Sequence, residues 1–184
     1  MSRRLAIFLP LLTGGGAERV TLSLAEGLRA EGVAVDLVVL RAEGPLVPLV
    51  PEGVRLVALA LPRARAAPRA IARYLQAARP DAMLSVLPEM DVAAALGRLL
   101  SRHRPRLVWT VHSMPSALPL LAGRHRARML RLMLRALLPG VSRVVAVSEG
   151  AAAEYRALIG GGAPLGPINN PGPHPPRRPP APPP

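Results

Sequence analysis

The sequence predicts an α/β protein built on a doubly wound parallel sheet. Short apolar runs alternate along the chain with segments of helical periodicity, which is typical of this fold class. Most of the strand-like runs are continuously apolar, as expected for parallel strands covered on both faces. A run of three glycines follows the first strand-like segment, at the place where such sheets bind ligands.

Six segments rich in aliphatic residues are predicted to be strands: residues 5–9, 34–40, 54–60, 82–87, 107–112 and 143–148. Four segments repeat apolar residues at helical spacing and are predicted to be helices: residues 18–30, 68–78, 91–102 and 124–138. The first helix carries Val20, Leu24 and Leu28 on one face, and Gly32 follows as a stop signal. Asp91 is predicted to cap the third helix.

The two ends of the chain differ from this pattern. Residues 171–184 contain nine prolines in fourteen positions, so we expect a disordered tail after a domain at residues 1–170. The opening MSRRLAIFLPLL resembles a signal peptide, but Pro10 interrupts its apolar run and a helical pattern follows, which favours a first strand. No stretch is long and uncharged enough to be expected to span a membrane.

Composition limits the classes of partner. The net charge of +13 comes from 24 basic and 11 acidic residues, and every basic residue is Arg, which favours an anionic partner such as a sugar nucleotide, a lipid phosphate or a membrane surface. Aromatic residues make up only 2% and no nucleic-acid motif is present, which argues against nucleic acid as a partner. The absence of Cys excludes disulfides and cysteine metal sites and fits a cytoplasmic protein.

The glycine run is the first candidate site. Gly14, Gly15 and Gly16 join the first strand to the first helix, where free backbone N–H groups favour an anion. A plain tight turn is the alternative interpretation. The spacing is not a dinucleotide fingerprint, because Arg19 stands where the third glycine belongs, and no Gly-Lys-Ser/Thr follows as in a Walker A loop.

Four stretches in order give the sequence a family resemblance: TGGGAERVTLSLAEGLRAEGVAVDLVVL, ARPDAMLSVLPEMDVAAALGRLL, RLVWTVHSMPS, and SRVVAVSEGAAAEYRALIG with the following PINNP. Together they resemble the N-terminal domain of the glycosyltransferase family 4 enzymes. The resemblance implies one of the two Rossmann-like domains of a GT-B glycosyltransferase. It also implies transfer of a sugar from a nucleotide-sugar to a glycan or lipid-linked acceptor, usually with retention and without an essential metal or other cofactor.

The resemblance also suggests roles for single residues. Gly14, Gly15 and Gly16 would approach the donor phosphates or the transferred sugar. His112, at the end of its strand, matches a histidine that contacts the sugar in several relatives, and it is the candidate catalytic residue, although a lone histidine at a strand end is often only a polar loop residue. Glu18 and Arg19 are expected to stabilise the loop and the helix start.

The resemblance suggests roles for three further residues near its C-terminal end. Ser148 and Glu149 end the last predicted strand and are candidates for donor binding, although Glu149 is equally suited to cap the helix that follows. Asn170 would lie near the hinge between the two domains.

The fourth predicted helix carries a basic stripe. Arg124, Arg128, Arg131 and Arg135 recur at helical spacing. A broad apolar arc accompanies them: Met129, Leu132, Met133, Ala136 and Leu137. One interpretation is a crossover helix packed on the sheet with its arginines in water. The other is a helix that lies on an anionic membrane, placing the protein at the inner face of the membrane.

The family match stops at Asn170, before the donor-binding domain that the resemblance implies. We therefore expect a truncated or frameshifted glycosyltransferase that is nearly inactive alone, so enzyme status stays open. The alternatives are a half-enzyme that works with a second chain supplying the C-terminal domain, and a stand-alone nucleotide-binding module that holds NADP through Arg41. The missing third glycine argues against the module.

Overall fold

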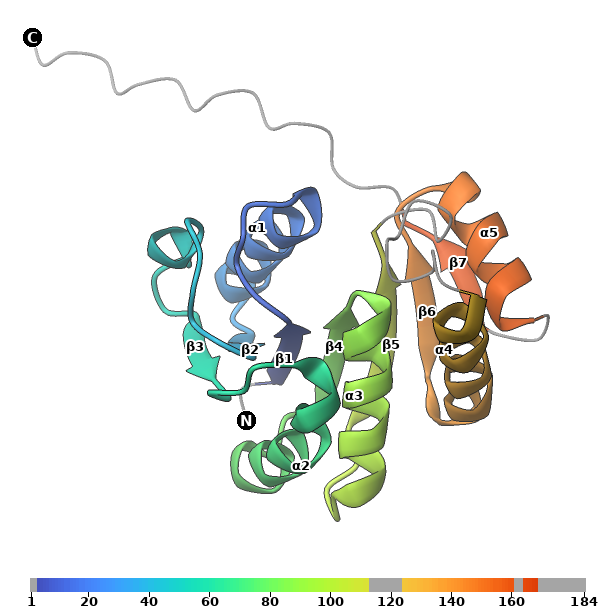
Figure 1. Cartoon of the computed structure of the whole chain (residues 1–184). Coiled ribbons are helices and arrows are strands. Elements are labelled where there is room, and N and C mark those ends of the chain that lie inside the picture. The colour runs from blue at the N-terminus through green and yellow to red at the C-terminus, as the bar shows by residue number, and fades with distance from the viewer. Residues whose placement is uncertain (1–2, 113–123, 161–163, 169–184) are drawn as a thin grey trace, which may run out of the picture.

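A computed structural model describes residues 3–112, 124–160 and 164–168, and within them the chain forms one seven-stranded parallel sheet (Figure 1). The strand order is β3-β2-β1-β4-β5-β6-β7. The strands are β1 (Arg4–Leu9), β2 (Ala34–Val39), β3 (Arg55–Ala58), β4 (Ala82–Val86), β5 (Arg106–Val111), β6 (Arg143–Ala146) and β7 (Leu165–Pro167).

The described helices connect these strands. They are α1 (Gly16–Ala30), α2 (Ala67–Ala78), α3 (Pro88–Leu100), α4 (Arg124–Leu137) and α5 (Glu149–Ile159), with short 3-10 turns at Val47–Leu49, Ala64–Ala66 and Leu138–Gly140. The predicted doubly wound α/β sheet is therefore confirmed, including all six predicted strands and all four predicted helices. The strand β7 was not predicted, because its sequence LGP has no strand-like pattern of its own.

The helices cover the two faces of the sheet unequally. From β1 the sheet extends through β2 to β3 on one side and through β4, β5 and β6 to β7 on the other. Right-handed crossovers in these two directions place α1 on one face and the later helices on the opposite face. Helices α2, α3, α4 and α5 pack side by side in chain order, whereas α1 contacts β2 on the other side (Figure 1).

Alternation along the strands divides the core accordingly. On β1, Ala6 and Phe8 belong to the cluster under α2 to α5, while Ile7 and Leu9 belong to a smaller cluster under α1. Trp109 of β5 is fully buried in the larger cluster. The two clusters hold the two faces of one sheet, and among the described residues no helix covers β5 to β7 on the α1 side.

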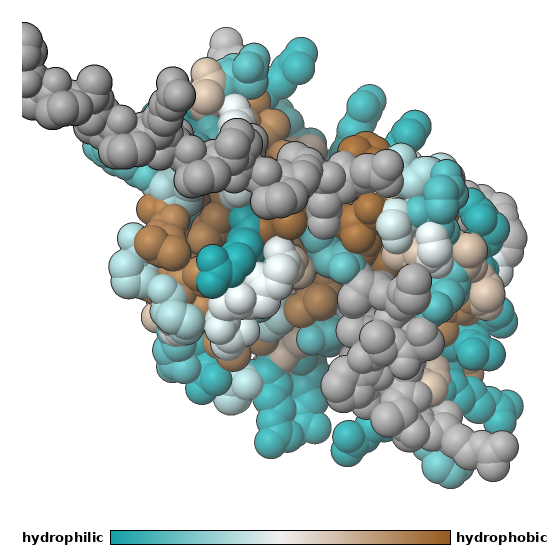
Figure 2. All heavy atoms as spheres, turned by 90° about the horizontal axis from the view of Figure 1, so that it is seen from above, coloured by the Kyte–Doolittle hydropathy of each residue, from teal (hydrophilic) through white to brown (hydrophobic). Residues whose placement is uncertain are grey.

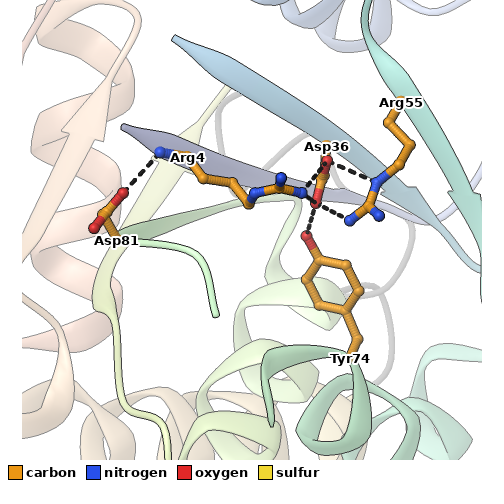
Figure 3. Close-up of polar contacts among 5 residues, drawn as sticks. All are labelled: Arg4, Asp36, Arg55, Tyr74 and Asp81. Carbon is orange, nitrogen blue, oxygen red and sulfur yellow. Dashed lines mark hydrogen bonds and ion pairs between the residues drawn. The ribbon is translucent and has the colours of Figure 1, made fainter. Parts of the chain in front are cut away.

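A buried aspartate ties the sheet to α2 (Figure 3). Asp36 of β2 is 2% exposed and receives hydrogen bonds from Arg4 Nη1 (3.2 Å to Oδ2), Arg55 Nε (2.9 Å to Oδ1) and the Tyr74 hydroxyl (2.5 Å to Oδ2). Burial opposes ionisation of Asp36, but the hydrogen bonds from Arg55 and Tyr74 and the charges of both arginines outweigh it and lower its pKa. Asp36 is therefore a charged anchor joining four elements.

A second buried aspartate joins α3 to its neighbours. Asp91 is 1% exposed, and its carboxyl accepts hydrogen bonds from Ser85 Oγ of β4 (2.5 Å) and the Tyr155 hydroxyl of α5 (3.1 Å). Burial raises its pKa well above the ordinary value. The prediction that Asp91 caps α3 is wrong: the helix begins at Pro88 with Leu87 at the cap position, and Asp91 points into the core.

Several predicted features fall on residues outside the described part. These are the hinge residue Asn170, the tail at residues 171–184, and the side chain of Arg124. In the part of the chain that the structure describes, no helix combines the length and the hydrophobicity that crossing a membrane requires.

Candidate functional site

The carboxyl edge of the sheet gathers most of the predicted site residues. Gly14, Gly15 and Gly16 follow β1, His112 follows β5, and Ser148 follows β6. Because the strands are parallel and β1, β4, β5 and β6 are neighbours, these residues share one edge. Figure 2 looks onto this edge and shows hydrophobic surface set among hydrophilic residues.

The glycine loop has a defined geometry. Gly14 has φ +106°, a conformation that favours glycine, and Gly15 is the N-cap residue of α1. Thr13 Oγ1 donates a hydrogen bond to Glu18 Oε1 (3.0 Å), and Arg19 Nε donates one to the Gly14 carbonyl (3.4 Å). The expectation that Glu18 and Arg19 stabilise the loop and the helix start is confirmed.

Glu18 also fills part of the space at the loop. Its side chain is 8% exposed, and a Cβ added to Gly15 would collide with its carboxylate. A larger residue at position 15 would therefore require the Glu18 carboxylate to move. The carboxylate lies near the α1 N-terminus, where it complements the helix dipole. A donor phosphate at this point would meet a carboxylate, so a sugar hydroxyl, which can donate a hydrogen bond to it, fits the loop better.

His112 lies half-buried beside α1. Its Nδ1 is buried and has no hydrogen-bond partner among the described residues. Burial lowers the pKa of His112, and the charge of Glu18 opposes that effect only in part. The lowered pKa favours the neutral imidazole at pH 7, and His112 is one of the residues that line the groove beside α1.

Ser148 has a structural partner. Its side chain caps α5, because the Ala151 N–H donates a hydrogen bond to Ser148 Oγ (3.2 Å). Glu149 is the first residue of α5 and is exposed, so the cap of this helix is Ser148 and not Glu149. The structure places both residues at the predicted edge, one strand beyond His112.

Sequence reasoning missed one residue of this edge. Leu87 follows β4, between the glycine loop and His112, and has φ +77° and ψ 142°. A non-glycine residue in this region costs of order 1–3 kcal/mol and occurs mainly where the surroundings impose it. Pro88 directly after it, which restricts the residue before it, was the one available signal.

Metal binding has no support in the described residues. No group of three or more His, Asp and Glu side chains comes close enough together there to hold a metal ion. The site that the structure offers consists of a glycine turn, a neutral imidazole and a capped helix N-terminus.

Comparison with solved structures places this fold. Sucrose-phosphate synthase from Thermosynechococcus elongatus matches with a TM-score of 0.71 and 18% identity over 91% of this chain and 48% of that chain. HepE of Anabaena in complex with UDP and glucose matches with a TM-score of 0.65 and 18% identity, over 90% of this chain and 44% of that one. An α-glucosyltransferase in complex with UDP and a 13-mer DNA matches with a TM-score of 0.56 and 15% identity, over 93% and 43%.

The chain therefore spans less than half the length of these structures, and it shares the Rossmann-like fold of GT-B glycosyltransferases with one part of each. Two of the three contain UDP. No curated protein matches the sequence. A family model described as a glycosyl transferase 4-like domain matches residues 15–170. The chain belongs to this family of glycosyl transferase 4-like domains.

Proposed function

We propose that this chain is the acceptor-side half of a retaining glycosyltransferase that moves a sugar from a nucleotide-sugar to a glycan or lipid-linked acceptor. The observation that carries the proposal is His112, whose pKa is lowered and whose buried Nδ1 has no hydrogen-bond partner, beside the glycine loop at the carboxyl edge of a glycosyl transferase 4-like domain. The edge lies where parallel sheets bind their ligands.

Each site residue has a role in this proposal. His112 binds a hydroxyl of the transferred sugar through its imidazole, and Glu18 accepts a hydrogen bond from a second hydroxyl. Gly16 leaves open space beside the loop, since nothing lies within 4 Å of a Cβ added there. The donor nucleotide binds mainly to a second half supplied from outside these residues, so the chain alone transfers sugar slowly or not at all. No metal is required.

Thermal unfolding with added nucleotides tests the proposal. We expect UDP-glucose or GDP-mannose at millimolar concentration to raise the melting temperature of the chain and NADP to leave it unchanged. His112→Ala removes the shift, whereas His125→Ala, an exposed histidine on α4, keeps it. Stabilisation by NADP alone would favour the nucleotide-binding module instead. Full sugar transfer by the isolated chain would disprove the need for a second half.

The location proposed for the enzyme is the inner surface of a membrane. Helix α4 buries Leu130 and Leu134. Three large apolar residues of the predicted arc are exposed: Met129 by 58%, Leu132 by 54% and Met133 by 42%. The helix packs against the core through Leu130, Leu134 and Leu137 with its arginines exposed, as the crossover interpretation expects, and not through Met129, Leu132 and Met133.

Arginines surround these exposed apolar residues. Arg128, Arg131 and Arg135 are exposed and form no ion pair with any described residue. An exposed apolar ridge flanked by cations is the pattern of a helix that lies in an anionic interface. Sedimentation with vesicles tests this: we expect binding to phosphatidylglycerol vesicles and none to phosphatidylcholine vesicles. Failure to bind anionic vesicles even at low salt would contradict the proposal.

A further inference from the structure

A pocket of about 280 Å³ lies at the amino edge of the sheet, opposite the candidate site. One wall is the C-terminal end of α2, with Gln76 and Arg79, and the other is the loop between α3 and β5, with Arg102, His103 and Arg104. Both walls come just before a strand, β4 and β5 respectively, so the pocket lies where these neighbouring strands begin. Its lining contains three arginines and no carboxylate.

Hydrogen bonds within the chain hold the two walls together. Nε2 of His103 lies 2.7 Å from the carbonyl oxygen of Pro80, and since a carbonyl oxygen only accepts, the ring nitrogen is the donor. This bond joins the loop after α3 to the turn before β4. The backbone N–H of His103 donates to Ser101 Oγ (3.1 Å), and Ser101 is only 2% exposed. A ligand would therefore meet a pocket that the fold has already formed.

Arg79 occupies a backbone position that favours glycine. It is the C-cap residue of α2, with φ +47° and ψ 54°, in the left-handed region. Helices commonly end on such a residue, which is usually Gly and sometimes Asn, because a Cβ is strained there. The side chain of Arg79 is exposed and forms no ion pair with any described residue. The backbone alone does not explain an arginine here, which indicates a use for its guanidinium group.

The fold explains the other two arginines to different degrees. Arg104 donates hydrogen bonds to the carbonyl oxygens of Ser101 (3.5 Å) and Leu99 (3.4 Å), so it satisfies the last turn of α3. Arg102 is exposed, and within the described chain its side chain has neither a hydrogen bond nor an ion pair. Arg102 and Arg79 thus both have guanidinium donors available to a ligand.

Like charges repel one another around the pocket. Arg98 donates a hydrogen bond to the Pro105 carbonyl behind the loop (2.6 Å). Burial lowers the pKa of Arg98, and the charge of Arg104 lowers it further. Asp81, just before β4, does not approach these arginines in an ion pair, and its carboxylate accepts the backbone N–H of Arg4 (2.7 Å; Figure 3). An anion in the pocket would reduce the repulsion.

The charge of the pocket favours an anion even when the helix dipoles are counted. The C-terminal ends of α2 and α3 contribute about half a negative charge each, whereas the three arginines contribute three positive charges. Guanidinium groups bind phosphate oxygens through two parallel hydrogen bonds. The volume is slightly below the usual range of roughly 300–1,000 Å³ for small-molecule pockets, which fits a compact anion.

We propose that this pocket binds a compact phosphorylated anion, a diphosphate or a phosphate monoester, through Arg79, Arg102 and Arg104. The site is separate from the candidate sugar site, because the two lie at opposite edges of the sheet. It therefore does not depend on the proposed sugar transfer.

Titration with inorganic pyrophosphate tests the proposal on the whole chain. We expect calorimetry at constant ionic strength to show binding of one pyrophosphate per chain. The double variant Arg79→Gln/Arg102→Gln should bind it roughly 10-fold or more weakly, because charge-assisted hydrogen bonds are lost. The control Arg69→Gln/Arg73→Gln removes the same charge from exposed positions of α2 outside the pocket, and its affinity should stay within about twofold of the wild type.

Three outcomes would overturn the proposal. The first is an absence of pyrophosphate binding to the wild-type chain. The second is equal weakening in the two double variants, which would mean that only the net charge of +13 attracts the anion. The third is loss of binding in His112→Ala with binding intact in Arg79→Gln/Arg102→Gln, which would place the anion at the carboxyl edge.

Vesicles distinguish a free anion from a lipid headgroup. Phosphatidic acid presents a phosphate monoester on a membrane surface. If pyrophosphate displaces the chain from phosphatidic acid vesicles and Arg79→Gln/Arg102→Gln fails to bind them, the ligand of the pocket is a lipid headgroup. If this variant binds the vesicles as the wild type does while losing pyrophosphate, the ligand is a free phosphorylated molecule.

Discussion

The two faces of this sheet bury their residues in different ways. The face under α2 to α5 is closed by four neighbouring helices and contains both buried aspartates, Asp36 and Asp91. The α1 face has a smaller core and an open groove over β4 to β6. The closed face is complete within the described residues, whereas the open face is not. Stability should therefore depend on the closed face, and assembly on the open one.

The largest stability loss is expected from the charged anchor of the closed face. Asp36→Ala should lower the free energy of unfolding by about 3 kcal/mol, because Arg4 and Arg55 lose their buried partner while remaining partly hydrated. Urea denaturation measures the change. Glu43→Ala, which breaks the exposed pair with Arg41, is the control and should cost less than about 1 kcal/mol. Equal losses in the two variants would show that Asp36 is no anchor.

The next largest effect is expected for vesicle binding by the arginines of α4, on the outer surface of the closed face. Replacing Arg128, Arg131 and Arg135 with Gln should weaken binding to phosphatidylglycerol vesicles roughly 100-fold, because each surface arginine contributes about 1 kcal/mol. Leu24→Glu in the open groove should leave vesicle binding unchanged. A comparable loss in Leu24→Glu would mean that the open face, and not α4, meets the membrane.

Substitutions of two adjacent valines in β6 allow a direct comparison of the stability that each face contributes. Val144→Ala, on the closed side of β6, should cost about 2 kcal/mol, because it removes two buried methyl groups and leaves a cavity. Val145→Ala, on the groove side, should cost less than about 1 kcal/mol, since this side chain is already partly in water. Chemical denaturation of both variants measures the difference.

The smallest effect is expected from the second buried aspartate, Asp91. Its pKa shift, and so its effect on the pH dependence of stability, is opposite in direction to that of Asp36. The pKa of Asp91 is raised in the folded protein, so its contribution to stability is fully present below its unfolded pKa and is lost as pH rises through the folded pKa. Asp91→Asn should therefore be more stable than the wild type at pH 8, by about 1 kcal/mol at most. The pKa of Asp36 is lowered, so its contribution is lost only as pH falls below the ordinary range.

Stability measured from pH 3 to pH 8 separates these two residues. The Asp91→Asn curve should lose the decline toward high pH and keep the decline in acid. The Asp36→Asn curve should lose the decline in acid. A wild-type curve that is flat above pH 5 would contradict the raised pKa of Asp91.

Much of the architecture was readable from the sequence, because the signals are local. Continuous apolar runs such as residues 34–40 specify buried parallel strands wherever they lie, and the glycines after β1 specify a turn that needs positive φ. The position of His112 at the carboxyl edge followed from strand order in the chain. The strand β7 and the positive φ of Leu87 were not predicted, because neither has a distinctive local sequence pattern. Neighbouring elements of the fold impose both.

The sequence by itself determined the sheet, its helices and the edge where the candidate site lies, because apolar periodicity and turn residues act over a few positions. Only the tertiary structure decided which apolar stripe of α1 and of α4 is buried and which faces outward. It also decided that Asp91 is a buried core residue with a raised pKa and not a helix cap. Both decisions depend on which surfaces long-range packing brings together, and a helical stripe looks the same in the sequence whether its neighbour is the sheet, a membrane or another chain.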